Sequence, residues 1–150
     1  MTVGTKDLLI RAVNEDDLAC LVNIETLNTD RGWTLKQFVQ AMDCTHVLCI
    51  DRTVVGFFVM MIRGDQSELH NISVHPRYQN RGYGRFLLNR AVTQLDSVVS
   101  QVFLEVRISN FRAISLYNSF GFVEIDIRRD YYPSAMGQRG RCGNVFAALV

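Results

Sequence analysis

The chain has 150 residues and a mass of 17.1 kDa, a length that fits one domain over residues 1–150. Hydrophobic residues make up 48% and charged residues 21%, which is ordinary globular usage and excludes disorder or low complexity as the main state. The 16 Lys and Arg residues against 15 Asp and Glu residues give a net charge of +1. This balance predicts no general attraction to nucleic acid or to an anionic membrane.

No apolar run reaches the roughly 20 residues that a transmembrane helix needs, and the first residues lack the apolar stretch of a signal peptide. We therefore expect a cytoplasmic protein that binds neither a membrane nor nucleic acid directly. The 4 cysteines form no Cys-x-x-Cys pair, so we expect buried free thiols. His70 and His75 lack further ligands at metal spacing and are interpreted as structural or solvated, so we predict no metal site.

The first part of the chain predicts one strand and two helices. The strand covers residues 8–13, and Asn14 caps the helix that follows it. A second helix begins at Thr34, where Gln37 completes a capping box. Helical spacing predicts that Phe38 and Met42 form the buried face of this second helix.

The hydrophobic period then changes to two, which predicts strands over residues 47–50, 54–63 and 68–74. Residues 51–53 form the turn between the first two of these strands. In the third strand the apolar phase slips between Leu69 and Ile72. Either a β-bulge of one extra residue or an ordinary irregularity explains the slip.

The rest of the chain predicts a helix over about 82–98, a strand over 102–108, a helix from Asn110 to Gly121, and strands over about 123–128 and 144–150. In the strand over 102–108 the apolar residues alternate with Phe103, Glu105 and Arg107. The order β-α-α-β-β-β-α-β-α-β-β predicts an α/β or α+β domain with a mixed sheet.

The segment from Pro76 to Arg85 joins a predicted strand to a predicted helix. Its glycines let the backbone approach a ligand closely, and the helix start offers unpaired N–H groups and a positive dipole end. Arg81 and Arg85 add charge-assisted donors. These features suit a pyrophosphate, although the glycines could also only form a tight turn. Leu87 stands where a dinucleotide fingerprint requires its third glycine, and no Gly-Lys-Ser/Thr of a P-loop follows.

Glu105 is the unusual residue of its strand, because a carboxylate in a central strand costs free energy unless it is paired or faces a cleft. It is either an ion-pair partner of Arg107 or Arg129, or a general base. Tyr117 shares a helix stripe with Asn110. It is either a residue at the edge of the core or a proton donor to a leaving group.

Two aromatic residues leave a similar choice open. Trp33 is either a core anchor or a lid over a substrate, and Tyr131 either packs in the core or forms the wall of a peptide groove.

The run Gln79-Asn80-Arg81-Gly82-Tyr83-Gly84 resembles the acyl-CoA loop of the GCN5-related N-acetyltransferase (GNAT) superfamily. Further motifs resemble its RimI-like branch, whose members acetylate the N-terminal alanine of a ribosomal protein. These motifs are Leu104-Glu105-Val106-Arg107, Ser109-Asn110, Leu116-Tyr117, Gly121-Phe122 and Arg128-Arg129-Asp130-Tyr131-Tyr132-Pro133. The resemblance covers nearly the whole chain and is densest from Asn71 to Pro133.

The resemblance implies the GNAT fold, a mixed and mostly antiparallel sheet of about six or seven strands flanked by about four helices and splayed at an acetyl-CoA cleft. It implies direct attack of an amine on acetyl-CoA as cosubstrate, with no metal. Glu105 matches the general base and Tyr117 the general acid of the family. These roles agree with the ordinary pKa values: an α-ammonium of pKa about 8 needs a base at neutral pH, and a phenol of pKa about 10 is still protonated and can donate to the departing sulfur. The cofactor-binding residues it implies are Ile72, Ser73, Val74, Gln79, Asn80, Arg81, Gly82, Tyr83, Gly84, Arg85 and Asn110, and the substrate residues are Trp33 and Tyr131.

The acceptor stays open at this point, because the loop Ser134–Gly143 carries Arg139 and Arg141 where many relatives have a shorter loop with acidic residues. Three acceptors are possible alternatives: the N-terminal alanine of a ribosomal protein, a lysine, and a small amine. A non-catalytic acetyl-CoA sensor is the remaining alternative, which the retention of Glu105 and Tyr117 disfavours. We expect a monomer or a weak dimer.

Overall fold

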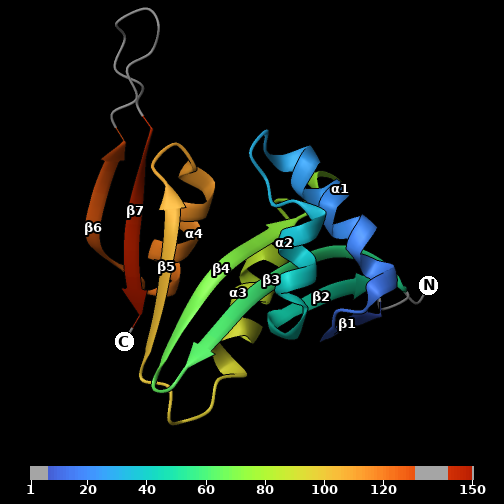
Figure 1. The fold of residues 1–150 in the computed structure, drawn as a ribbon, viewed down its shortest axis with the longest axis horizontal. Coiled ribbons are helices and arrows are strands. Elements are labelled where there is room, and N and C mark those ends of the chain that lie inside the picture. Colours follow the sequence, from blue (N-terminus) through green and yellow to red (C-terminus); the bar gives the residue numbers. More distant parts are fainter. Residues whose placement is uncertain (1–6, 131–141, 150) are drawn as a thin grey trace, which may run out of the picture. The chain divides into compact units, whose positions relative to one another are not determined.

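The computed structural model describes residues 7–130 and 142–149. Its seven strands form one open sheet in the order β1-β2-β3-β4-β5-β7-β6 (Figure 1). Strands β4 and β5 run parallel, whereas β1 with β2, β2 with β3, β5 with β7, and β6 with β7 run antiparallel. A mixed sheet of seven strands with four α-helices confirms the predicted fold class.

The strands are β1 (Leu8–Ala12), β2 (Thr45–Ile50), β3 (Thr53–Arg63), β4 (Gln66–Val74), β5 (Gln101–Arg107), β6 (Val123–Asp130) and β7 (Cys142–Leu149). The α-helices are α1 (Leu18–Asn28), α2 (Leu35–Gln40), α3 (Tyr83–Thr93) and α4 (Phe111–Phe120), and short 3₁₀ turns cover Glu15–Asp17, Met42–Cys44 and Pro76–Tyr78.

The chain divides into two compact units. Unit 1 comprises residues 1–61 and 71–94, and unit 2 comprises residues 62–70 and 95–150. In unit 1, α1 and α2 cover one face of β2 and β3, and α3 covers the other face (Figure 1). The core between the helices α1 and α2 and the strands β2 and β3 consists of fully buried side chains from all four elements: Leu21, Ile24, Phe38, Val47, Phe57 and Val59.

Local chemistry explains how the elements of unit 1 begin. The predicted capping box is confirmed, because the Thr34 hydroxyl accepts the Gln37 N–H and the Gln37 side chain accepts the Thr34 N–H. Asp51 and Arg52 have φ values of 47° and 72°, the left-handed backbone of a two-residue hairpin turn. Ahead of α1, the buried Asp17 carboxylate binds Arg11 through two hydrogen bonds of 2.7 and 2.9 Å.

In unit 2, β5 alternates as its sequence predicts. Val102, Leu104 and Val106 are buried, whereas Glu105 and Arg107 are exposed. Helix α4 ends at Gly121, whose φ of 113° is the left-handed conformation that glycine adopts readily. A Cβ at Gly121 would lie 3.4 Å from Cδ1 of Leu149 on β7, so the end of α4 lies against this strand.

Three expectations were wrong. Helix α3 ends at Thr93 rather than near Val98, because the chain beyond it forms a turn in which the Asp96 backbone carbonyl accepts the Val99 N–H. Met42 lies beyond α2, in the following 3₁₀ turn, and is only half-buried. Cys20 is exposed, so of the three free cysteines whose side chains are described only Cys49 is buried.

No helix within residues 7–130 and 142–149 has the length and apolar character needed to cross a membrane.

Candidate active site

One group of candidate residues forms the loop that leads from β4 into α3, in unit 1. Asn80 and Gly82 have φ values of 62° and 86°, so the chain turns twice through the left-handed region before the helix begins. Gly82 is the N-cap of α3, and its carbonyl accepts the first helical hydrogen bond, from the Phe86 N–H at 3.0 Å. The first N–H groups of an α-helix have no partner within the helix, so those of the first turn of α3 suit an anion.

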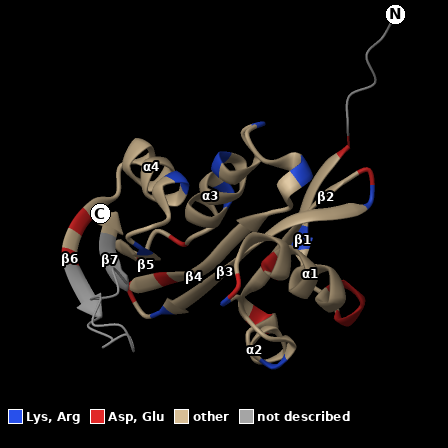
Figure 2. Cartoon of the chain, turned by 90° about the horizontal axis from the view of Figure 1, so that it is seen from above, with Lys and Arg blue, Asp and Glu red and all other residues tan. Residues whose placement is uncertain are grey.

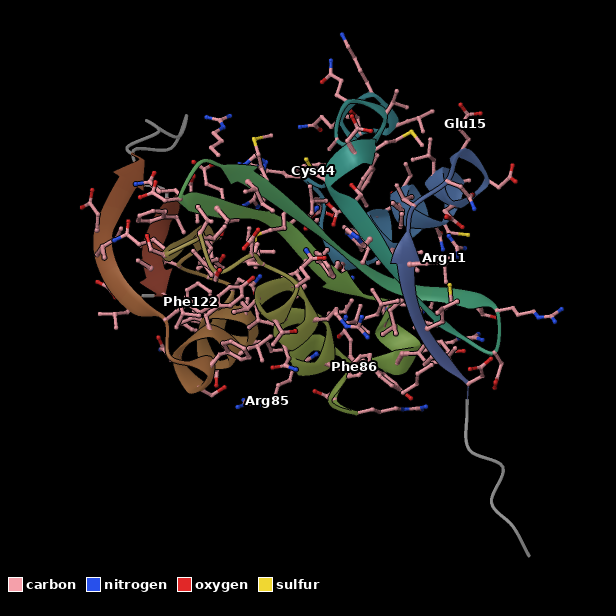
Figure 3. The ribbon with its side chains drawn as sticks, turned by 90° about the horizontal axis from the view of Figure 1, so that it is seen from below. Arg11, Glu15, Cys44, Arg85, Phe86 and Phe122 are labelled. Carbon is pink, nitrogen blue, oxygen red and sulfur yellow. The ribbon has the colours of Figure 1, made fainter. Side chains whose placement is uncertain are left out.

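Side chains give the same loop a positive and aromatic character. Residues 76–85 contain 3 arginines and no carboxylate, and the basic residues of the loop and of α3 appear blue in Figure 2. The Arg81 guanidinium lies 5.8 Å from the centre of the Tyr78 ring, within the range of a cation–π interaction. Arg85 and Phe86 project from the start of α3 and are exposed (Figure 3).

Gln79, the first residue of the loop motif, has its side chain turned back toward β4. Its Nε2 donates to the Val74 carbonyl at 2.9 Å and to Asn28 Oδ1 at 2.8 Å. Asn28 Nδ2 donates to the same Val74 carbonyl at 3.0 Å. That carbonyl therefore already accepts two hydrogen bonds, which matches its two lone pairs. A ligand along Ile72–Val74 has to use other backbone groups.

Gly56 on β3 supports this end of β4 from behind. A Cβ at Gly56 would lie 2.8 Å from the Ser73 carbonyl oxygen and 3.0 Å from Cδ1 of Leu87. Only glycine lets β3, β4 and α3 approach so closely.

A second group of candidate residues lies in unit 2 and contains Glu105. The parallel ladder between β4 and β5 runs from Gln66 and Gln101 to Leu69 and Leu104, so Glu105 is the next residue of β5 after the last paired one. Its side chain is exposed, and the desolvation cost expected for a carboxylate inside a sheet therefore does not arise.

Tyr117 approaches β5 from the other face. Directly opposed residues of an antiparallel pair point to the same side, and Leu149, against which α4 ends, is opposite Val102. Helix α4 thus covers the face of β5 that carries Val102, Leu104 and Val106, whereas Glu105 points to the opposite face. Tyr117 is 7% exposed, and the centre of its ring lies 5.6 Å from the centre of the Phe122 ring. Burial raises the pKa of its phenol.

The other predicted site residues have mixed outcomes. Asn110 caps α4, with its Oδ1 accepting the Ala113 N–H at 3.2 Å, which leaves its amide N–H groups for a ligand. Trp33 is half-buried, and the centre of its ring lies 5.4 Å from that of the core residue Phe38. This contact is typical of a core anchor. Tyr131 and most of the loop Ser134–Gly143 lie outside the described residues.

The histidines next to the loop have local partners. His70 Nε2 lies 2.9 Å from Glu68 Oε2, and His75 Nδ1 accepts the Arg77 N–H at 3.1 Å.

Two polar residues of α1 were not predicted as part of the site. Asn28 binds Ser73, Val74 and Gln79, and Glu25 Oε2 accepts the Trp33 N–H at 2.8 Å. Glu25 had a signal in the sequence, since it is a carboxylate at helical spacing from Leu18 and Leu21, which are buried. Asn28 had none, because its partners lie 45 to 51 residues away.

The family model described as the acetyltransferase (GNAT) family matches residues 10–122. The chain belongs to this acetyltransferase family. The candidate residues from Ile72 to Tyr117 fall inside the matched range. The resemblance inferred from the loop and strand motifs is therefore confirmed, and this acetyltransferase is an enzyme by family membership.

Individual relatives are similar over most of this acetyltransferase. The ribosomal protein bS18-alanine N-acetyltransferase of Escherichia coli (strain K12) is 35% identical over 133 residues, which are 86% of this chain and 90% of that protein. The enzyme of the same name from Salmonella typhimurium is 44% identical over 91 residues, which are 60% of this chain and 62% of that protein.

A solved structure supports the same relationship. The crystal structure of the ribosomal-protein-S18-alanine N-acetyltransferase from Escherichia coli matches with a TM-score of 0.83 at 33% identity, over 95% of this chain and 93% of that chain. The acetyltransferase therefore resembles the RimI-like enzymes in sequence and in fold.

Proposed function

We propose that this acetyltransferase transfers the acetyl group of acetyl-CoA to the N-terminal α-amine of an alanine-starting ribosomal protein, with Glu105 as general base and Tyr117 as general acid. The observations that carry the proposal are the exposed carboxylate of Glu105 on β5 and the buried phenol of Tyr117 on α4, the helix that packs on β5. Family membership and the names of the relatives support the reaction and the acceptor.

The start of α3 fits the pyrophosphate of acetyl-CoA. The N–H groups of the first helical turn after Gly82 and the guanidinium groups of Arg81 and Arg85 would bind the phosphate oxygens. Tyr83 and Gly84 would contribute backbone N–H groups, and Asn80 the left-handed turn before them. Free backbone groups of Ile72, Ser73 and Val74 would align the pantetheine chain, and the Asn110 amide would add a further contact. When bound, acetyl-CoA supplies the thioester that the amine attacks.

Glu105 would take the proton that must leave the acceptor. An α-ammonium has a pKa of about 8, so at neutral pH most acceptor molecules carry a proton and cannot attack. An exposed carboxylate on β5 removes that proton directly or through one water molecule. The C–N bond then forms as the C–S bond of the thioester breaks.

Tyr117 would supply a proton to the sulfur that departs. Burial raises the pKa of the phenol, so Tyr117 keeps its proton at neutral pH and has one to give. The nitrogen loses two protons on the way from ammonium to amide: Glu105 takes the first and releases it to solvent, and the second, carried by solvent, replaces the proton that Tyr117 gave to the sulfur. One proton is released for each acetyl group transferred.

The acceptor follows from the relatives and from one feature of the sequence. Two relatives are named for the alanine of ribosomal protein bS18, which supports an alanine N-terminus, with Trp33 and Tyr131 as residues that would contact it. The second candidate acceptor is a lysine or a small amine. It is favoured by Arg139 and Arg141 in the loop Ser134–Gly143, because basic side chains would repel a basic peptide.

Mass spectrometry after incubation with acetyl-CoA tests the acceptor. The peptides are an alanine-starting ribosomal peptide, the same peptide with a blocked N-terminus, and a peptide whose only free amine is an internal lysine. One acetyl group on the free N-terminus alone is the expected result. Acetylation of lysine alone would replace the α-amine proposal with the second candidate. No transfer to any of the three peptides would leave a small amine as the acceptor to test.

A further inference from the structure

The last turn of α1 connects two loops of unit 1 through side-chain hydrogen bonds. Asn28, its final residue, donates through Nδ2 to Ser73 Oγ at 2.7 Å and to the Val74 carbonyl at 3.0 Å. It accepts from Gln79 Nε2 at 2.8 Å. One amide side chain therefore holds both the end of β4 and the first residue of the glycine loop.

The network is closed, which makes it stiffer than three separate bonds. Gln79 Nε2 also donates to the Val74 carbonyl, at 2.9 Å, so Asn28, Val74 and Gln79 each contact the other two. Both lone pairs of that carbonyl are used. The loop can therefore move away from the strand only if several hydrogen bonds break together.

The same turn of α1 also holds the segment that follows the helix. Glu25 lies three residues before Asn28 and is buried, and its Oε2 accepts the Trp33 N–H at 2.8 Å. Gly32 is packed against it, since a Cβ there would lie 2.8 Å from the same oxygen. Glu25 thus fixes the segment that carries Trp33, and Asn28 fixes the proposed cofactor loop.

We propose that Asn28 is a positioning residue for acetyl-CoA: it sets the distance between the end of β4 and the glycine loop, and so pre-organises the groups that would bind pantetheine and pyrophosphate. This inference rests on the proposed acetyl-CoA site. Asn28 acts through Ser73, Val74 and Gln79, and it does not take part in proton transfer.

Asn28→Ala tests the inference, with Asn23→Ala as its control. Asn23 is an exposed asparagine on the same helix, and its side chain makes no hydrogen bond to any residue of the described part of the chain. Acetyl-CoA binding is measured by calorimetry, KM and kcat by steady-state kinetics, and Tm by thermal unfolding. Loss of the amide should raise the Kd and the KM for acetyl-CoA about tenfold, with kcat within about threefold of wild type. Asn23→Ala should leave all four quantities unchanged.

A nearly isosteric variant keeps the test decisive if Asn28→Ala unfolds. Asn28→Asp still accepts from Gln79 but cannot donate to Ser73 or Val74, so its Kd for acetyl-CoA should rise at least as far. Equal Kd values for wild type and both Asn28 variants would overturn the positioning role, as would a lower Tm with unchanged Kd. Absence of acetyl-CoA binding in the wild type as well would overturn the proposed site itself, and this inference with it.

Discussion

Glu105 and Tyr117 lie on opposite faces of β5. The carboxylate points to the exposed face of the strand, whereas the phenol belongs to α4, which packs on the face of Val102, Leu104 and Val106. A base and an acid separated by a sheet cannot neutralise one another directly. Under the proposed mechanism, Glu105 accepts a proton from the amine and Tyr117 delivers a proton to the sulfur.

Tyr117→Phe should lower kcat about 10²–10⁴-fold, because it removes the proton donor. The ring contact with Phe122 is kept, so Tm should stay close to that of the wild type. Because burial raises the pKa of Tyr117, the wild-type kcat should not fall between pH 8 and about 10, the ordinary pKa of a phenol. The kcat of Tyr117→Phe and of the wild type, measured from pH 8 to about 10, tests both the loss of activity and its pH dependence. A fall in wild-type kcat centred near pH 10 would count against the buried phenol as the acid.

Gly82→Ala should weaken acetyl-CoA binding because of backbone strain. Gly82 has a φ of 86°, and no other atom lies within 4 Å of the point that a Cβ would occupy, so the penalty of about 1–2 kcal/mol comes from the left-handed conformation alone. Gly64→Ala is the matched control, with a φ of 61° and the same open space, but far along the sequence from the loop. Both variants should lose similar stability, and only Gly82→Ala should raise the KM for acetyl-CoA, about tenfold. A similar rise in both would argue against the loop as the cofactor site.

Asp17 should make folding sensitive to acid. Its hydrogen bonds with Arg11 hold the pKa of this carboxyl below its ordinary value, so the stabilisation is full above the pKa of the unfolded chain, about 3.9. It is lost as the pH falls through the lower pKa of the folded state. Asp17→Ala should reduce the free energy of unfolding at pH 7 by about 1–3 kcal/mol. Asp16→Ala, at an exposed neighbour, should have little effect, and equal losses in urea unfolding would refute the role of the Arg11 contact.

His46 should destabilise the fold at mildly acidic pH. Its Nδ1 is buried and has no hydrogen-bond partner among the described residues. Its ring stacks on Phe58, with the two ring centres 5.0 Å apart. Burial, together with the positive charge of Arg90, lowers the pKa of His46. A lowered pKa means that the unfolded chain binds the proton more tightly, so stability declines as pH falls below about 6.5. His46→Phe should therefore unfold with a free energy that changes less between pH 7.5 and 5.5. If the free energy of unfolding changed equally with pH in the variant and the wild type, His46 would not be the source of the acid sensitivity.

Local signals in the sequence were sufficient for most of the fold. The alternation through Glu105, the capping box at Thr34 and Gln37, and the glycine at the end of α4 each involve residues within a few positions of one another, and all were found. The end of α3 was missed because Val92 and Leu95 keep the helical apolar spacing, although the helix ends between them at Thr93.

The site was predictable only in part. The loop and Glu105 could be found because a glycine motif and a lone carboxylate stand out in an apolar context, and the resemblance gave Tyr117. The Asn28 network joins residues 45 to 51 positions apart, and no periodicity in one sequence predicts such a contact. The β-bulge suspected between Leu69 and Ile72 stays a prediction, although the alternating burial of β4 does end at Leu69.

The turnover number of Glu105→Gln tests the central claim most directly. Glu124→Gln is the control, since Glu124 is also an exposed carboxylate on a strand of unit 2. The measurement is kcat with an alanine-starting peptide at pH 7, together with the Kd for acetyl-CoA. The mechanism predicts a kcat lower by about 10²–10⁴-fold for Glu105→Gln, an unchanged Kd, and wild-type behaviour for Glu124→Gln. A kcat of Glu105→Gln equal to that of the wild type would contradict the assignment of Glu105 as the general base.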